Sequence, residues 1–197
     1  MKLLAFSDLH CDLSQAKRLT EWAGEADAVV CAGDLASVHS GLEDTVAVLR
    51  AIERPTLLVP GNNETDAALR EACAGWDAAS VLHGEVAEIE GLTFFGLGAG
   101  VPVTPWDWSF DLTEEEARSM LRRCPQECIL VVHSPPRGYA DSSGGAHLGS
   151  EAVLAAIEEK RPRLALCGHI HEAWRQEATV GSTLVINLGP GGRLLEL

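Results

Sequence analysis

The sequence predicts an α/β fold, a mostly parallel β-sheet with helices packed on its faces, from two observations. First, short apolar runs alternate with amphipathic runs: the strand-like segment Lys2–Phe6 precedes a helical pattern that starts at Leu13, and Asp27–Ala32 precedes one that starts at Leu42. Second, each of these strand-like segments ends in a short polar stretch before the next helix. This repetition is typical of parallel sheets, which bind ligands at the carboxyl ends of their strands.

The other elements follow from the same hydrophobic periods. Thr113 and Glu116 form a capping-box pattern that predicts the start of a helix. Short apolar runs bounded by turn residues predict the later strands. We expect helices over about 13–23, 42–52, 65–74, 113–123 and 150–160, and strands over 2–6, 27–32, 56–59, 80–82, 86–89, 93–97, 128–132, 164–167, 173–177 and 183–187.

No repeat, low-complexity tract or linker divides the 197 residues, so we expect one domain over residues 1–197. The longest irregular stretch covers residues 134–149 and is rich in Pro, Gly and Ser. A loop of that length is more often functional than accidental.

The composition argues against several classes of protein. A net charge of −14 repels the phosphate backbone, so broad nucleic-acid binding is not expected. No apolar run reaches the length of a membrane span, so we expect no membrane association. The six cysteines would suit disulfides in a secreted protein, but the chain opens on a strand rather than a signal peptide. We therefore expect reduced thiols and a cytoplasmic location.

Polar side chains of metal-ligand type lie at the ends of five predicted strands. Taken singly, each has a plain explanation, such as a helix N-cap for an aspartate or a turn for Gly-Asn. Seven of them at the ends of five strands outweigh those explanations, because such strand ends meet at one edge of a sheet. The predicted metal ligands are Asp8, His10, Asp34, Asn62, His133, His169 and His171.

Carboxylate, amide and imidazole ligands suit borderline or hard divalent ions. Asp34, the middle acid, is the natural bridge between two ions. Two ions roughly 3.5–4 Å apart can hold a bridging hydroxide and clamp a phosphoryl oxygen. We therefore expect two divalent metal ions as cofactors, with manganese favoured and iron, zinc, cobalt or nickel as alternatives. The expected partner is a small phosphoester substrate, hydrolysed by attack of the bridging hydroxide.

These motifs resemble those of the calcineurin-like metallophosphoesterase superfamily, and the region from His133 to Ser150 is similar to its small single-domain phosphodiesterase branch. The resemblance implies a four-layer α/β/β/α sandwich of two mixed sheets flanked by helices. It also implies that Asp8, His10 and His171 bind one metal, that Asn62, His133 and His169 bind the other, and that Asp34 bridges them. The matching segments are Asp8-Leu9-His10, Gly33-Asp34, Gly61-Asn62-Asn63-Glu64, His133 and Gly168-His169-Ile170-His171.

Position 63 departs from the family pattern, which has a histidine directly after the metal-binding asparagine. In relatives that histidine stabilises the transition state or protonates the leaving group, whereas Asn63 cannot act as a general acid at neutral pH. Relatives that lack the histidine tend to favour phosphodiesters, and we expect the same preference here. His39 and His147 are candidates to replace the acid, although for His39 a solvated loop position is the favoured interpretation. The predicted catalytic residues are Asp34, Asn63, His147 and His39.

Two tryptophans, Trp106 and Trp108, flank Asp107 in a loop-like segment. Stacking on a base is one interpretation, but such tryptophans more often attach a loop to the core, and we favour that interpretation.

The sequence thus predicts a metal-dependent phosphoric ester hydrolase, with a phosphodiesterase favoured. One alternative is a phosphomonoesterase or protein phosphatase. Another is a metal-binding protein-interaction scaffold without turnover, since the resemblance extends to superfamily members that have become scaffolds. The sequence carries no indication of the oligomeric state.

Overall fold

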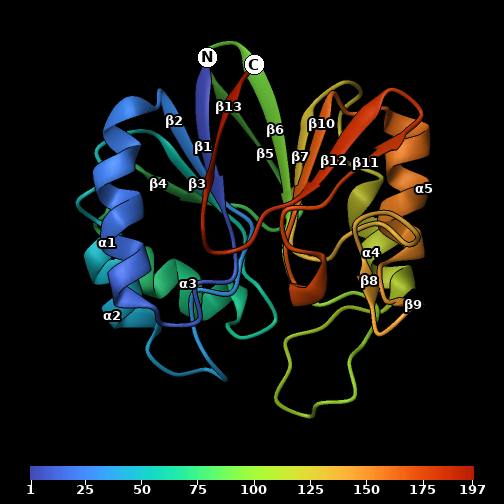
Figure 1. Ribbon diagram of the computed structural model, residues 1–197, viewed down its shortest axis with the longest axis horizontal. Coiled ribbons are helices and arrows are strands. Elements are labelled where there is room, and N and C mark those ends of the chain that lie inside the picture. Colours follow the sequence, from blue (N-terminus) through green and yellow to red (C-terminus); the bar gives the residue numbers. More distant parts are fainter.

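A computed structural model describes residues 1–197 and has four layers (Figure 1). Two β-sheets lie face to face in the middle. Helices α1, α2 and α3 cover the outer face of one sheet, and α4 and α5 cover the outer face of the other. The expected α/β/β/α sandwich of two mixed sheets is therefore confirmed.

The first sheet has the order β13-β1-β2-β3-β4. Its four N-terminal strands run parallel, and only β13 is antiparallel to its neighbour. The strands are β1 (Lys2–Phe6), β2 (Ala28–Cys31), β3 (Thr56–Leu58), β4 (Ala79–Val81) and β13 (Arg193–Glu196).

The second sheet has the order β11-β12-β10-β7-β6-β5. Its four inner strands run parallel, and the edge strands β11 and β5 are antiparallel. The strands are β5 (Glu85–Ile89), β6 (Leu92–Leu97), β7 (Ile129–Val132), β10 (Leu164–Cys167), β11 (Glu177–Val180) and β12 (Thr183–Asn187).

Side-chain alternation divides the core into three apolar layers. In β1, Leu4 and Phe6 pack beneath the helices, whereas Leu3 and Ala5 face the second sheet. Because successive side chains of a strand point to opposite faces, a strand that is buried on both sides reads as a continuous apolar run. The middle layer thus packs the two sheets face to face.

Four of the five α-helices start at a residue whose side chain caps them, and α2, which starts after Gly41, is the exception. Thr113 and Glu116 form the expected capping box, and Ser150 accepts a hydrogen bond from the Val153 N–H at the start of α5. No helix is long and apolar enough to cross a membrane. The helices are α1 (Leu13–Trp22), α2 (Leu42–Leu49), α3 (Asp66–Cys73), α4 (Glu114–Leu121) and α5 (Glu151–Lys160), with short 3-10 turns η1 (Ala23–Glu25) and η2 (His171–Ala173).

Three expectations about elements need correction. The strand expected over 173–177 is wrong, because η2 comes first and the tight turn at Gly181 (φ +60°) places β11 at Glu177–Val180. The stretch 134–149 is not wholly irregular, since β8 (Ser142–Ser143) and β9 (Ala146–His147) pair within it. The edge strand β13 was not expected, and it adds to β1 at the margin of the first sheet.

Candidate metal centre

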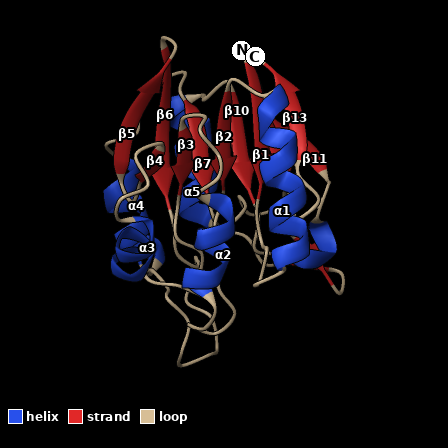
Figure 2. Ribbon diagram, turned by 90° about the vertical axis from the view of Figure 1, so that its left-hand side faces the viewer, coloured by secondary structure: helices blue, strands red, loops and turns tan.

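The carboxyl ends of the parallel strands of both sheets lie at the lower edge in Figure 1, and Figure 2 shows the loops that leave them at this edge. Several non-glycine residues there adopt left-handed backbone, Cys11, Val38 and His39 among them. So do the four residues Asp8, His10, Asp34 and His169, with φ between 43° and 69°. This conformation is costly for residues with a Cβ, and it clusters at functional sites. All four belong to the predicted ligand set.

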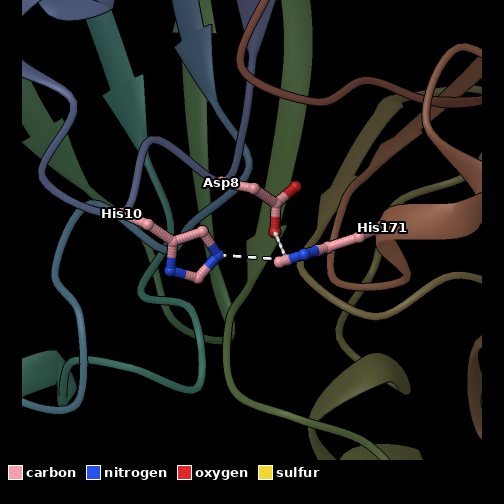
Figure 3. A group of neighbouring side chains, drawn as sticks. All are labelled: Asp8, His10 and His171. Atoms are coloured by element: carbon pink, nitrogen blue, oxygen red, sulfur yellow. Dashed lines mark hydrogen bonds and ion pairs between the residues drawn. The ribbon is translucent and has the colours of Figure 1, made fainter.

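One group of ligand-type side chains consists of Asp8, His10 and His171 (Figure 3). The loop after β1 supplies Asp8 and His10, and the turn after β10 supplies His171. The Nε2 atoms of the two histidines lie 3.0 Å apart, and His171 Nε2 lies 3.9 Å from Asp8 Oδ1. Three donor atoms from segments far apart in the sequence thus converge on one point.

Asp8 is buried, and three hydrogen bonds fix its carboxylate. The Ser7 hydroxyl and the Trp174 indole N–H donate to Oδ2, the latter at 3.2 Å, and the His169 backbone N–H donates to Oδ1 at 3.0 Å. Burial is the main cause that raises the pKa of Asp8 to about 6. A cation beside this carboxyl would stabilise its ionised form.

A second group consists of Asp34, His133 and His169. The Asn62 side chain lies between the two histidines, with Oδ1 3.2 Å from His133 Nε2 and 3.0 Å from His169 Nδ1. His133 Nδ1 lies 2.8 Å from the Ala32 carbonyl oxygen, to which it donates. This hydrogen bond leaves the Nε2 lone pair of His133 directed into the site.

Asp34 lies between the two groups. Its Oδ2 is 3.5 Å from His10 Nε2, and its Oδ1 is 3.5 Å from His133 Nε2. Burial raises the pKa of this carboxyl to about 7, while hydrogen bonds from Asn63 lower it. Each oxygen therefore faces a different group, a geometry in which one carboxylate can bridge the two groups.

Glu64 accepts a hydrogen bond from the Asp34 backbone, and no role was predicted for it from the sequence. Its buried carboxylate accepts the backbone N–H groups of Asp34, Ala36 and Gly61 at 2.8, 2.9 and 2.7 Å. A Cβ at Gly61 would collide with the Asp34 carboxylate, so this glycine is required for the close approach. The acidic residue at the end of the segment Gly61-Asn62-Asn63-Glu64 was the feature of the sequence that could have indicated this role.

The turn that carries His169 is held by Asn187. Its Nδ2 donates to the carbonyl oxygens of Gly168 and Ile170, which flank His169, and to that of Ala140. The end of β12 thus fixes the loop after β10.

The donor set fits two divalent ions. Burial lowers the pKa of His171 to about 4 and that of His169 well below its ordinary value. Both imidazoles are therefore neutral and hold free lone pairs at physiological pH. Two adjacent clusters of imidazole and carboxylate donors, each with its atoms within 4.8 Å of one another, form a site consistent with a dimetal centre.

Of the other three predicted catalytic residues, one lines the cavity at the site and two do not. Asn63 lines the cavity at the site, but its Nδ2 donates to Asp34 Oδ2 at 2.8 Å and its Oδ1 accepts the Val38 N–H at 2.9 Å. His39 bonds through Nε2 to the Trp108 carbonyl, and the cavity lining does not include it. His147 is half exposed outside the lining, where its Nδ1 lies 2.7 Å from buried Asp141.

A cavity of about 580 Å³ opens over the two groups. One wall comprises the ligand-type residues, and the other comprises the loop of residues 101–110. Trp106 is 50% exposed and lines this cavity together with Trp108. The interpretation that both tryptophans attach the loop to the core is therefore wrong, because the side chain of Trp106 faces the cleft rather than the core.

Comparison with known proteins agrees with the geometry. The model of the calcineurin-like phosphoesterase superfamily domain matches residues 1–195. A UPF0046 protein of Caenorhabditis elegans is 30% identical over 84 residues, which cover 43% of this chain and 29% of that protein. The chain spans less than a third of the length of the curated relatives it matches.

Solved structures share the fold at low identity. TT1561 of Thermus thermophilus superposes with a TM-score of 0.77 at 18% identity, over 96% of this chain and 90% of that one. A structure described as a novel archaeal phosphodiesterase superposes with a TM-score of 0.59 at 19% identity, over 96% of this chain and 84% of that one.

Proposed function

Because the chain belongs to the calcineurin-like phosphoesterase superfamily, we propose that it is a dinuclear metal-dependent phosphoesterase that favours phosphodiesters. The observation that carries the proposal is the position of Asp34, with one carboxylate oxygen toward His10 and the other toward His133. A carboxylate shared between two donor clusters can hold two ions close enough to act on one phosphoryl group.

In this proposal the seven ligand-type side chains divide between two ions. Asp8, His10 and His171 bind one ion. Asn62, His133 and His169 bind the other, and Asp34 bridges them. When bound, divalent ions supply Lewis acidity toward the phosphoryl oxygens and a nucleophilic water at neutral pH. We propose manganese as the activating ion, because the mixed carboxylate, amide and imidazole donors suit it.

Asn63 and Glu64 orient the shared carboxylate. The Asn63 amide donates to Asp34 Oδ2, and Glu64 binds the Asp34 backbone N–H. Both contacts keep the Asp34 oxygens pointed at the two clusters. Asn63 also lines the cavity, so its amide N–H lies beside the place where a phosphoryl oxygen would bind.

Two features of the cavity favour diesters over monoesters. No lysine or arginine lines it, so the second negative charge of a monoester would meet no side-chain cation. The cavity also lacks a proton donor for a poor leaving group beyond the ligand histidines: hydrogen bonds from the Gly144 N–H and the Ser143 hydroxyl lower the pKa of Glu172, which keeps it ionised.

The proposal is tested by hydrolysis of bis(p-nitrophenyl) phosphate and p-nitrophenyl phosphate, with Mn²⁺ and with EDTA. We expect metal-dependent cleavage of the diester, loss of activity in Asp34→Asn, and no change in Asp77→Asn, which alters an exposed acid far from the cavity. Faster cleavage of the monoester would overturn the diester preference. No turnover of either ester by protein that carries two ions would favour a scaffold without catalysis.

A further inference from the structure

We propose that the loop of residues 101–110 forms a subsite for an uncharged aromatic ester group of the substrate. This inference rests on the proposed function, because the subsite would receive one ester group of a phosphodiester whose phosphorus lies at the metal centre. Val38 and Leu148 complete the subsite from the opposite side of the cavity.

Exposed apolar side chains are concentrated at this cavity. Four of the eight large hydrophobic side chains that the protein exposes line it. Water contact with apolar surface is unfavourable, and a rim of this kind over a polar floor is typical of small-molecule sites. The four are Val38, Val103, Trp106 and Leu148.

The charges around the cavity select against a second anionic group. The chain carries a net charge of −14, and the only charged side chains among the lining residues, apart from the histidines, are Asp34 and Glu172. A further phosphate or carboxylate at the loop wall would therefore meet no lysine or arginine there, because the positive charge of the proposed site lies at the metal ions and is used by the phosphoryl group. The loop wall therefore favours an uncharged ester group.

The tryptophans favour a planar ring over a flexible chain. The rings of Trp106 and Trp108 are stacked, with centroids 5.5 Å apart and an interplanar angle of 11°. Stacking fixes the orientation of the half-exposed Trp106 ring and presents it to the cavity. Aromatic groups that stack on such a ring gain affinity beyond what the buried area alone supplies.

The loop is fixed at its base rather than free to move. Both oxygens of Asp111 accept hydrogen bonds from the loop: Oδ1 from the Ser109 hydroxyl at 2.7 Å, and Oδ2 from the Thr104 N–H at 2.8 Å and the Thr104 hydroxyl at 2.7 Å. A side chain at Gly100 would collide with Asp111, so this contact needs a glycine. The tryptophan wall is thus preorganised before a ligand binds.

The same loop is tied directly to the metal centre. The Asn62 side-chain Nδ2 donates to the Ser109 hydroxyl at 2.9 Å, and the Phe110 N–H donates to the Asn62 carbonyl at 2.9 Å. His39 adds a third link through the Trp108 carbonyl. Because Asn62 is a proposed ligand, the aromatic wall has a defined position relative to the reacting phosphorus.

Phosphinates test the subsite without requiring turnover, because their carbon–phosphorus bonds are not hydrolysed. We would measure the affinity of Mn²⁺-loaded protein for dimethyl-, dihexyl- and diphenylphosphinate and for a carboxylated diphenylphosphinate, by isothermal titration calorimetry. All four present the same phosphinate anion to the metal centre. We expect diphenylphosphinate to bind about tenfold more tightly than the dimethyl compound, the usual gain from stacking. The carboxylated compound should bind more weakly than diphenylphosphinate.

Variants assign the preference to the loop. Trp106→Ala should remove most of the preference for diphenylphosphinate, and Trp106→Phe should retain it. Val103→Lys should improve the carboxylated compound selectively, because it places a cation in the wall. The control is Val86→Ala, which shortens a side chain that is 48% exposed on β5, outside the cavity.

The outcomes separate the subsite from the function on which it rests. Equal affinity for the dimethyl and diphenyl compounds, an equal gain with the dihexyl compound, or an unchanged preference in Trp106→Ala would overturn the subsite alone. Absence of binding by every phosphinate would overturn the subsite and the phosphoesterase proposal together. A diphenyl preference that depends on Trp106 supports the subsite even in protein that shows no hydrolysis.

Discussion

Replacing Glu64 with alanine removes the acceptor of three buried backbone N–H groups, two in the turn that carries Asp34 and one in the loop after β3. The carboxylate accepts the N–H groups of Asp34, Ala36 and Gly61, all within 2.9 Å. A buried donor left without a partner costs about 1–3 kcal/mol. Part of this loss is offset, because burial raises the pKa of Glu64 and its ionised form is itself expensive to bury. We expect Glu64→Ala to lower the free energy of unfolding by roughly 3–5 kcal/mol.

Glu64→Gln provides the graded comparison. Its amide oxygen replaces Oε1 and keeps the Asp34 and Gly61 contacts, whereas its NH₂ group faces the Ala36 N–H and loses that bond. We therefore expect a smaller loss, about 1–3 kcal/mol. The assay is urea unfolding of EDTA-treated protein, followed by tryptophan fluorescence. The control is Glu71→Gln, an exposed residue of α3, which should stay within about 0.5 kcal/mol of the wild type.

The loss should also reach the metal centre. Asp34 has a left-handed backbone (φ +59°), which is maintained only while its surroundings fix it. Without Glu64 the turn can relax, and the bound metal per chain should fall together with stability. Stability of Glu64→Ala within about 0.5 kcal/mol of the wild type, or an equal loss in Glu64→Gln, would refute the reasoning, because either result means that the three contacts do not stabilise the turn.

Two further predictions concern protons and leaving groups. Metal binding should release protons near pH 6, because with pKa values raised to about 6 and 7 Asp8 is about half protonated and Asp34 is mostly protonated in metal-free protein. His171, with a pKa of about 4, is already neutral at this pH. The affinity for the metal ion should therefore rise with pH and level off above about pH 8. Calorimetry in buffers of different ionisation enthalpy measures the number of protons released. Zero proton release at pH 6 would contradict this expectation. The same shifts affect the stability of the metal-free protein with opposite signs. The raised pKa values of Asp8 and Asp34 lower stability as pH rises from about 4 to 7, and the lowered pKa of His171 raises it from about 4 to 6.5. Because the two carboxyl shifts together exceed the His171 shift, these three groups should give a net loss of stability as pH rises over this range. Asn63→His should raise the monoester-to-diester ratio of kcat/KM at least about tenfold, since a general acid contributes about 10²–10⁴-fold; an unchanged ratio would remove position 63 from the account of substrate preference.

The ligand-type residues were predictable because their positions follow from strand geometry. Parallel strands bring their carboxyl ends to one edge of a sheet, so the polar residues after β1, β2 and β3 lie near one another in the first sheet, and those after β7 and β10 lie near one another in the second. The pairing into two clusters came from the family resemblance. The contacts of Asp34 with His10 and His133 then appeared in the structure.

Contacts made by loop backbones were harder to predict from the sequence. Glu64 accepts three N–H groups whose directions depend on how two separate loops fold against each other. Trp106 could not be assigned to the cavity, because a tryptophan in a loop packs on the core or lines a cleft according to tertiary contacts. Here those contacts are the Asp111 hydrogen bonds at the base of the loop.

The end strands show the same limit. β13 pairs with β1 although some 190 residues separate them, and no local periodicity indicates such a pairing. The expectation of a strand over 173–177 was wrong because the fold uses that segment for η2 and for Trp174, whose indole donates to Asp8.

The most direct test of a catalytic two-ion centre is a titration of EDTA-treated protein with Mn²⁺, in which bound metal and hydrolysis of bis(p-nitrophenyl) phosphate are followed together. We expect two ions to bind per chain, with activity that appears as the second ion binds, and we expect Asp34→Asn to lose both the second ion and the activity. Full activity with one ion per chain, or activity that persists in EDTA, would contradict it.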